Sequence, residues 1–273
     1  MALWLGMVAL VLGDLRSRAS LARRSRIIAT AKGPIEVEIT GDGPGVLVLH
    51  GGLGGFDQGS WIAHALDLRA HRVVAVSRPG YLGTPDVGNL DAEADLYVAA
   101  LDALGIERIA VVGVSGGGVS TLHLAGRHPQ RLTRFVMLSA VSGPVADPGP
   151  GIAWFALRAS VDVNTSLLAA ALDPAKRQLV AGLLRTFASP ERRVRGSLRD
   201  LRLAGSFPPP DGIRVAALVV HGTADDAVPF EHAERSVRGC ISSTLIPIDG
   251  GRHLSLVTHA QVAERVREFL TAA

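Results

Sequence analysis

Short runs of apolar, often β-branched residues alternate with longer amphipathic stretches along most of this chain. That alternation is typical of a parallel sheet whose strands are joined by helices. The runs are apolar at successive positions rather than at every second one, so both faces of the predicted strands should be covered. Six buried strands are expected, at residues 46–50, 72–76, 109–114, 135–139, 216–221 and 244–248.

The pattern changes at both ends of this predicted core. Residues 35–40 alternate apolar and polar positions and end at Gly41-Asp42-Gly43, as an edge hairpin strand would. Residues 142–210 contain no good strand, open and close with Gly and Pro, and hold amphipathic helical stretches. We therefore expect an α/β core, residues 31–141 and 211–273, with a helical cap, residues 142–210, inserted between two strands.

Composition agrees with one sizeable domain that carries an insertion. The chain has 273 residues, of which 48% are hydrophobic and 19% charged, as in compact globular proteins. Cys240 is the only cysteine, so no intrachain disulfide can form. A reducing, cytoplasmic location is the simplest expectation.

The charge distribution argues against a nucleic-acid partner. The formal net charge is +3 and the sequence pI is about 9.6. Arginine clusters at residues 23–26 and 192–195 are not accompanied by aromatic residues, which make up 4% of the chain. Nucleic-acid surfaces combine a basic face with interleaved aromatics, so solvated arginine faces are the better interpretation.

Residues 1–30 form an apolar and then basic extension. The run Ala2 to Gly13 is apolar but has no positive charge before it, unlike a secretory signal. It is also shorter than the ~20 residues that span a bilayer. Two interpretations stay open: a helix packed on the body or on a partner, and an anchor that holds residues 1–13 at a membrane surface.

The strongest chemical signal is Gly113-Val114-Ser115-Gly116-Gly117, directly after a predicted strand and before a predicted helix. This G-x-S-x-G context is that of a nucleophile elbow, with Ser115 exposed on a sharp turn between small neighbours. The N–H of Gly116 would face a developing oxyanion. A phosphate-binding loop would continue with Lys, whereas this chain continues with Val119.

A serine nucleophile needs a base and a carboxylate, and both are expected after later strands. Asp225 follows the strand at 216–221, and His253 follows the strand at 244–248 on a loop that contains Gly250 and Gly251. Catalytic groups of open parallel sheets gather at the carboxyl ends of the strands, where Ser115, Asp225 and His253 all fall. Asp226 is the competing carboxylate.

The second oxyanion donor is expected in the glycine-rich loop of residues 50–55. Gly52 is the first choice and Leu53 the second. An apolar acyl pocket is predicted, from position along the chain, to involve Phe56, Trp154 and Phe155.

These pieces together resemble the α/β-hydrolase superfamily from about Ile35 to Leu270. The resemblance implies an eight-stranded, mostly parallel sheet flanked by helices, a helical cap, and no cofactor or metal. Ser115 stands where haloalkane dehalogenases and epoxide hydrolases have an aspartate, and Leu53 stands where proline iminopeptidases have a proline. All three activities are therefore disfavoured.

The expected function is hydrolysis of a small carboxylic ester, lactone or related acyl bond of a carbonyl-containing small molecule. Carbon–carbon bond hydrolysis and cofactor-free haloperoxidase chemistry use the same triad and stay open. A ligand-binding or signalling protein with little turnover is a further alternative, as is a lipase-like enzyme at a membrane surface. Substrate identity and oligomeric state are not specified by these patterns.

Overall fold

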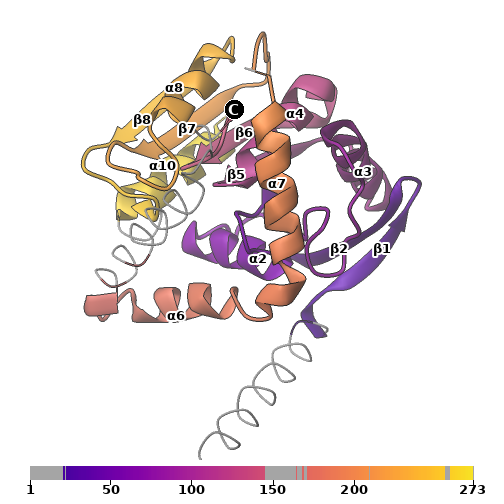
Figure 1. Cartoon of the computed structure of the whole chain (residues 1–273), viewed down its shortest axis with the longest axis horizontal. Coiled ribbons are helices and arrows are strands. Elements are labelled where there is room, and N and C mark those ends of the chain that lie inside the picture. The colour runs from indigo at the N-terminus through magenta and orange to yellow at the C-terminus, as the bar shows by residue number, and fades with distance from the viewer. Residues whose placement is uncertain are drawn as a thin grey trace, which may run out of the picture.

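The computed structural model describes Leu21 and residues 23–144, 164, 168, 171–208, 210–255 and 259–272. It contains an eight-stranded sheet in the order β1-β2-β4-β3-β5-β6-β7-β8 (Figure 1). The strands are β1 Arg26–Thr30, β2 Gly33–Thr40, β3 Gly45–Leu49, β4 Arg72–Val76, β5 Ile109–Val114, β6 Leu132–Leu138, β7 Ala217–Gly222 and β8 Ser243–Ile248.

Strand directions confirm the predicted mostly parallel sheet. β1 pairs antiparallel with β2, and β2 antiparallel with β4, whereas every pair from β4 to β8 is parallel. The sheet begins earlier than the boundary expected at residue 31, because β1 covers residues 26–30. All five residues of β1 are exposed or half-buried, so the strand lacks the apolar pattern that marks the others.

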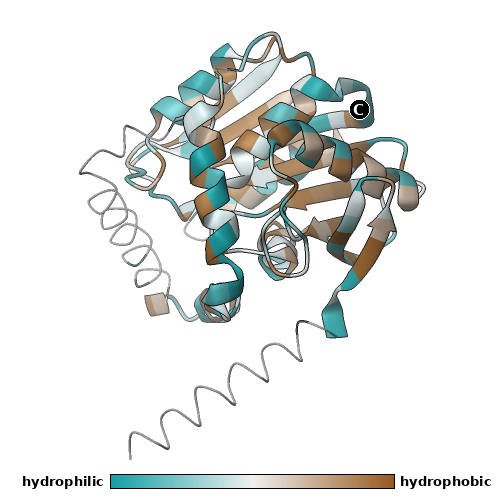
Figure 2. Cartoon of the chain, turned by 45° about the vertical axis from the view of Figure 1, so that its right-hand side comes forward, coloured by the Kyte–Doolittle hydropathy of each residue, from teal (hydrophilic) through white to brown (hydrophobic). Residues whose placement is uncertain are grey.

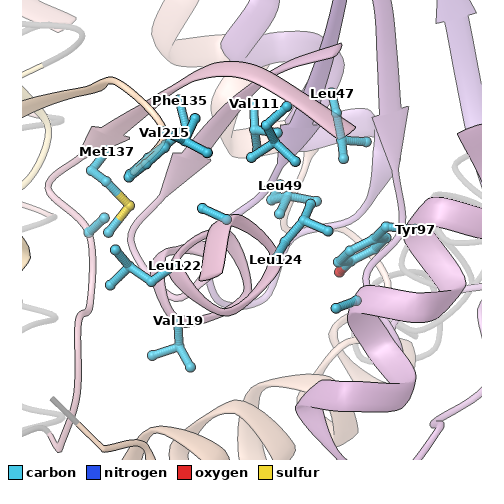
Figure 3. Packing of buried hydrophobic residues seen from close by; sticks show 14 of the residues in the cluster. Leu47, Leu49, Tyr97, Val111, Val119, Leu122, Leu124, Phe135, Met137 and Val215 are labelled. Carbon is cyan, nitrogen blue, oxygen red and sulfur yellow. The ribbon is translucent and has the colours of Figure 1, made fainter. Parts of the chain in front are cut away.

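Alternate residues of the central strands point to opposite faces of the sheet. Leu47 and Leu49 of β3 join one apolar cluster with α3 and α4, whereas Val46 and Val48 join another with α2 and α10. Figure 3 shows the first cluster, in which strand side chains face Leu122 of α4. The helices are α2 Phe56–Ala65, α3 Leu90–Ala103, α4 Gly117–Arg127, α8 Glu231–Arg238 and α10 Ala260–Thr271.

The described part of the insertion between β6 and β7 is helical. Its elements include α6 Arg177–Arg185, the 3-10 turn η2 Pro190–Arg192, and α7 Val194–Ser206. Another 3-10 turn, η1 Pro129–Arg131, precedes β6. α6 packs through Val180 and Leu183 against Trp61 of α2, while α7 runs beside the loop that follows β4 (Figure 1).

Helix α7 and the residue before it attach to the core mainly through ion pairs. Arg193 donates two hydrogen bonds to the Asp57 carboxylate, at 3.0 and 2.8 Å, and both side chains are buried. Arg199 Nη1 lies 2.6 Å from Glu93 Oε2, again with both partners buried. The exposed side of α7 carries apolar as well as polar residues (Figure 2), with Val194, Leu198 and Leu201 exposed. Charge pairing therefore holds this helix in place more than apolar packing does.

We predict that Arg193→Met lowers the free energy of unfolding by about 3–5 kcal/mol, because it leaves the buried Asp57 carboxylate without its partner. Urea denaturation measures the loss. The matched control is Arg238→Met, which removes an exposed pair with Glu234 at 3.8 Å and should cost less than about 1 kcal/mol. Equal losses in the two variants would contradict the prediction.

A buried histidine ties the start of the insertion to α8. His232 Nδ1 accepts the backbone N–H of Ser142 at 3.1 Å. Burial, reinforced by Arg235, lowers the pKa of His232 from its ordinary value near 6.5 to about 4. Between these values the unfolded chain binds a proton that the folded chain does not, so stability must fall as pH falls from about 6.5 to about 4.

We predict that His232 contributes about 2 kcal/mol to the loss of stability between pH 7 and pH 5. The variant His232→Asn keeps an acceptor for Ser142 and cannot be protonated, so its stability should depend less on pH by that amount. Chemical denaturation at the two pH values provides the comparison. His64→Asn makes the same substitution at an exposed position of α2 and is the control for the substitution itself. An unaltered slope in His232→Asn would refute the assignment.

Within the ranges that the structure describes, no helix is both long and apolar enough to cross a bilayer. Residues 1–13, to which the membrane-surface expectation refers, lie outside the described part of the chain.

Candidate active site

Ser115 occupies the turn between β5 and α4 in a left-handed backbone conformation, with φ of 51°. Its backbone N–H donates to Leu138 O at 3.1 Å, and its carbonyl oxygen accepts the N–H of Val141 at 2.9 Å. Both partners lie at the end of β6 or just beyond it. The strained turn is therefore fixed from the neighbouring strand, and it presents the hydroxyl at the carboxyl edge of the sheet.

The glycines around Ser115 are required by close packing, against backbone at Gly117 and against a side chain at Gly113. A Cβ on Gly117 would lie 2.4 Å from Leu49 O and 2.8 Å from His50 O. A Cβ on Gly113 would lie 2.1 Å from Thr121 Oγ1. No side chain fits at either distance, so the small residues of the motif follow from packing as well as from the turn itself.

Ser115, His253 and Asp225 are brought together in one hydrogen-bonded row. His253 Nε2 lies 3.0 Å from Ser115 Oγ, and His253 Nδ1 lies 2.9 Å from Asp225 Oδ2. Asp225 follows β7 and His253 follows β8, so loops at three strand ends supply the three groups. The hydroxyl is within reach of a base that a carboxylate orients.

Asp225 sits in a pocket built for a charged carboxylate. Its Oδ1 accepts the N–H groups of Ala227 at 2.9 Å and Val228 at 2.8 Å. Burial raises the pKa of Asp225, but His253, His221 and these N–H groups outweigh burial and hold the pKa well below its ordinary value. The carboxylate therefore stays ionised throughout the neutral range.

The competing carboxylate does not reach the same place. Asp226 is half-exposed, and its Oδ2 lies 3.7 Å from Arg252 Nη1. Asp225, in contrast, is buried and contacts the imidazole directly. The geometry thus separates two neighbouring aspartates that the sequence could rank only by spacing.

The two glycines expected to supply N–H groups to an oxyanion lie close together in space. Gly52 N lies 3.4 Å from the position that a Cβ on Gly116 would occupy. Among the described residues, no hydrogen bond uses the N–H of Gly52 or Gly116. Leu53 differs, because its N–H donates to Ser197 Oγ of α7 at 2.8 Å. In this arrangement Gly52, rather than Leu53, has a donor available.

His50 fixes the loop that carries Gly52. Its Nε2 accepts the N–H of Arg78 at 3.0 Å, which leaves the proton on Nδ1 to bond Gly51 O at 2.7 Å. Burial, with help from Arg78, holds the pKa of His50 well below its ordinary value, so the ring is neutral. Gly51 N–H also donates to Gln58 Oε1 at 2.9 Å. The loop is therefore tied on both sides.

A buried ion pair next to this loop was not predicted from the sequence. Arg78, fully buried after β4, pairs through both terminal nitrogens with Asp200 of α7, and Tyr81 donates its hydroxyl proton to the same carboxylate. Burial raises the pKa of Asp200 and the Arg78 guanidinium opposes that rise. The available signal was the charged Arg78, two residues after a strongly apolar strand and at the edge of the sheet where sites form.

Of the three residues expected to line an acyl pocket, the structure describes Phe56 alone, and its contacts do not bring it to Ser115, Asp225 or His253. Phe56 is fully buried at the start of α2, where its ring lies under Arg24 and its N–H donates to Ser77 Oγ. Trp154 and Phe155 lie outside the described residues.

Two further features bear on the chemistry. Over the described ranges, no cluster of three or more His, Cys, Asp or Glu side chains has the arrangement of a metal site. Burial raises the pKa of Cys240 to about 11, so its thiol is a packing group rather than a nucleophile.

Residues 46–265 match the alpha/beta hydrolase family. The chain belongs to this family. The matched region holds β3 to β8, the Ser115 turn, and the loops that carry Asp225 and His253.

Among curated relatives, the chain is 30% identical over 206 residues to 2-hydroxymuconate semialdehyde hydrolase of Pseudomonas sp. CF600, covering 68% of this chain and 70% of that protein. It is 34% identical over 125 residues to the uncharacterized hydrolase YcgS of Bacillus subtilis, covering 45% of this chain and 43% of YcgS. It is 28% identical to the dihydrolipoyllysine-residue acetyltransferase component of an acetoin cleaving system of Pseudomonas putida, over 85% of this chain and 65% of that protein. The chain therefore matches less than two thirds of the length of YcgS and of the acetyltransferase component.

Solved structures share the fold over nearly the whole chain. An alpha/beta hydrolase fold protein from Nakamurella multipartita superposes with a TM-score of 0.76 at 31% identity, covering 90% of this chain and 98% of that one. The esterase RhEst1 from Rhodococcus sp. gives 0.70 at 20% identity, covering 91% and 99%. The enol-lactonase from Burkholderia xenovorans gives 0.70 at 20% identity, covering 90% and 100%. At 20% identity the esterase and the enol-lactonase support the fold alone.

We predict that Gly117→Ala lowers the free energy of unfolding by about 1–3 kcal/mol or more, because its Cβ would overlap the backbone of β3. Thermal and urea denaturation measure the change. Gly126→Ala is the matched control on the same helix: nothing lies within 4 Å of its Cβ, and alanine favours helix, so stability should rise by about 0.5–1 kcal/mol. A neutral Gly117→Ala would show that the turn relaxes without cost.

Proposed function

We propose that this chain is a serine hydrolase that cleaves a small carboxylic ester or lactone through an acyl-enzyme. The observation that carries the proposal is the row from Ser115 Oγ to His253 Nε2 at 3.0 Å and from His253 Nδ1 to Asp225 Oδ2 at 2.9 Å. A serine hydroxyl becomes a nucleophile when a base within hydrogen-bond distance accepts its proton.

In the first half-reaction Ser115 Oγ attacks the carbonyl carbon while its proton moves to His253 Nε2. The N–H groups of Gly52 and Gly116 stabilise the oxyanion, and each such donor is worth about 3–4 kcal/mol in the transition state. His253 then gives the proton to the leaving oxygen. In the second half-reaction His253 takes a proton from water as the water oxygen attacks the acyl carbon, and it returns that proton to Ser115 Oγ as the bond to the acyl carbon breaks and the acid leaves. Asp225 keeps the proton of the neutral ring on Nδ1 and stabilises the charged ring.

A second candidate is hydrolysis of a carbon–carbon bond next to a ketone. A relative that is 30% identical over 68% of this chain is named as a 2-hydroxymuconate semialdehyde hydrolase. The same triad and donor pair would serve there. The two candidates differ in the leaving atom, which is oxygen in an ester or lactone and carbon in the second reaction. Assays with both kinds of substrate distinguish them.

We predict that a fluorophosphonate probe labels the wild-type protein and that Ser115→Ala abolishes both labelling and hydrolysis of short-chain p-nitrophenyl esters. Asp225→Asn should lower kcat about 10⁴-fold, because the amide favours the wrong ring tautomer. Asp226→Asn is the matched control and should stay near the wild-type rate, because that side chain faces Arg252. Circular dichroism establishes that each variant is folded.

The same preparation is assayed with 2-hydroxymuconate semialdehyde, followed by absorbance. A kcat/KM well above that for the esters would favour the carbon–carbon candidate. A folded wild-type protein that neither reacts with the probe nor turns over any of these compounds would refute the hydrolase proposal and favour a ligand-binding role.

A further inference from the structure

The helix α7 places two polar side chains beside the proposed oxyanion donors. Ser197 Oγ bonds Leu53 N at 2.8 Å and would lie 3.8 Å from a Cβ on Gly52. Asp200 Oδ2 would lie 3.4 Å from a Cβ on Gly116, the same distance as Gly52 N. The Asp200 carboxylate and the Gly52 N–H therefore border the same side of Gly116.

These two side chains have unused hydrogen-bonding capacity. Asp200 accepts two bonds from Arg78 and one from Tyr81, whereas a carboxylate offers about four acceptor positions. Its side chain keeps 12% of its surface exposed. Ser197 Oγ accepts from Leu53, and its own proton can go to Tyr81 Oη at 3.3 Å or to a ligand. Asp200 and Ser197, which together we call the polar wall, thus offer a hydrogen-bond acceptor and a donor beside the proposed oxyanion donors.

The charges of this wall restrict what it can bind. Arg78 Nη2 would lie 3.5 Å from the same Cβ position on Gly116, so positive and negative groups are both close and nearly cancel. An ammonium group would meet Arg78, and a carboxylate would meet Asp200. A neutral hydroxyl can donate to Asp200 and accept from Ser197 without either repulsion. An alkyl group would cover these polar atoms without pairing them, which is unfavourable.

We propose that Asp200 and Ser197 select acyl groups that carry a neutral hydroxyl on the carbon next to the scissile carbonyl. The wall adjoins the donors for the carbonyl oxygen, so a substituent one bond away from the carbonyl carbon reaches it. This inference depends on the proposed hydrolase function, whose substrate class it narrows to 2-hydroxy esters and lactones.

The test compares kcat/KM for five ethyl esters: the two enantiomers of 2-hydroxypropanoate, propanoate, 2-aminopropanoate and monoethyl malonate. Wild type should favour one 2-hydroxy enantiomer over propanoate about 10-fold or more, with the amino ester and the anionic ester slowest. Ser197→Ala should reduce the hydroxy-to-plain ratio several-fold. Asp200→Asn should reduce it and should also raise the relative rate of the anionic ester, because Arg78 is then uncompensated. A purely structural role for Asp200 would not produce that change of preference.

Ser206→Ala is the matched control on the same helix. Its hydroxyl is exposed and bonds only carbonyls of its own helix, so the ratio should equal that of wild type. If Asp200→Asn loses its thermal transition, Ser197→Ala decides the question.

Wild-type rates that do not distinguish the hydroxy ester from propanoate, or that favour the amino ester, would overturn the inference. So would an unchanged ratio in the folded variants. Probe labelling of Ser115 distinguishes failure of this inference from failure of the hydrolase proposal. Protein that is labelled but shows no preference for the 2-hydroxy ester refutes the inference alone. Protein that is not labelled and hydrolyses no ester refutes both the inference and the hydrolase proposal.

Discussion

The left-handed turn at Ser115 is the constraint on which the geometry of this site depends. A non-glycine residue at φ of 51° costs roughly 1–3 kcal/mol and persists only where its surroundings hold it. Here Leu138 at the end of β6 and Val141 just beyond it hold the turn in place, and β3 approaches so closely that Gly117 has no room for a side chain. The hydroxyl therefore emerges at the edge where the loops after β7 and β8 deliver Asp225 and His253. The row of three groups follows from the order and spacing of the strands.

A different kind of contact holds the helix above this edge. The polar side of α7 is turned inward, with Arg193 on Asp57, Arg199 on Glu93 and Asp200 on Arg78. Buried ion pairs are poor sources of stability compared with apolar packing, because desolvation offsets most of the attraction. Ion pairs are more directional than apolar contacts, however, and each pair is compatible with one register of α7 against the loops below it. That register brings Ser197 within 2.8 Å of Leu53 N and Asp200 next to Gly116.

The sheet, and the three residues that the structure brings into one hydrogen-bonded row, could be predicted because their signals are local. Continuous apolar runs mark buried strands, and G-x-S-x-G marks a turn whose context can be read on either side. The choice between Asp225 and Asp226 needed coordinates, since one residue of spacing separates a buried partner of His253 from a half-exposed partner of Arg252. β1 was not predicted, because its five residues are all exposed or half-buried and show no clear apolar period.

The polar wall could not be predicted for a more basic reason. Arg78 and Asp200 lie 122 positions apart, and neither belongs to a motif that requires the other. From sequence alone Asp200 is one of several charges on an amphipathic helix, and the expected orientation of such a helix places its charges in solvent. The orientation of α7 is the reverse of that expectation, because its exposed face carries Leu198 while its inner face carries charged side chains. A carboxylate beside oxyanion donors would oppose the developing negative charge if it stood alone. Pairing with Arg78 nearly cancels this effect, and what is left is a neutral, hydrogen-bonding surface suited to discriminating among substrates.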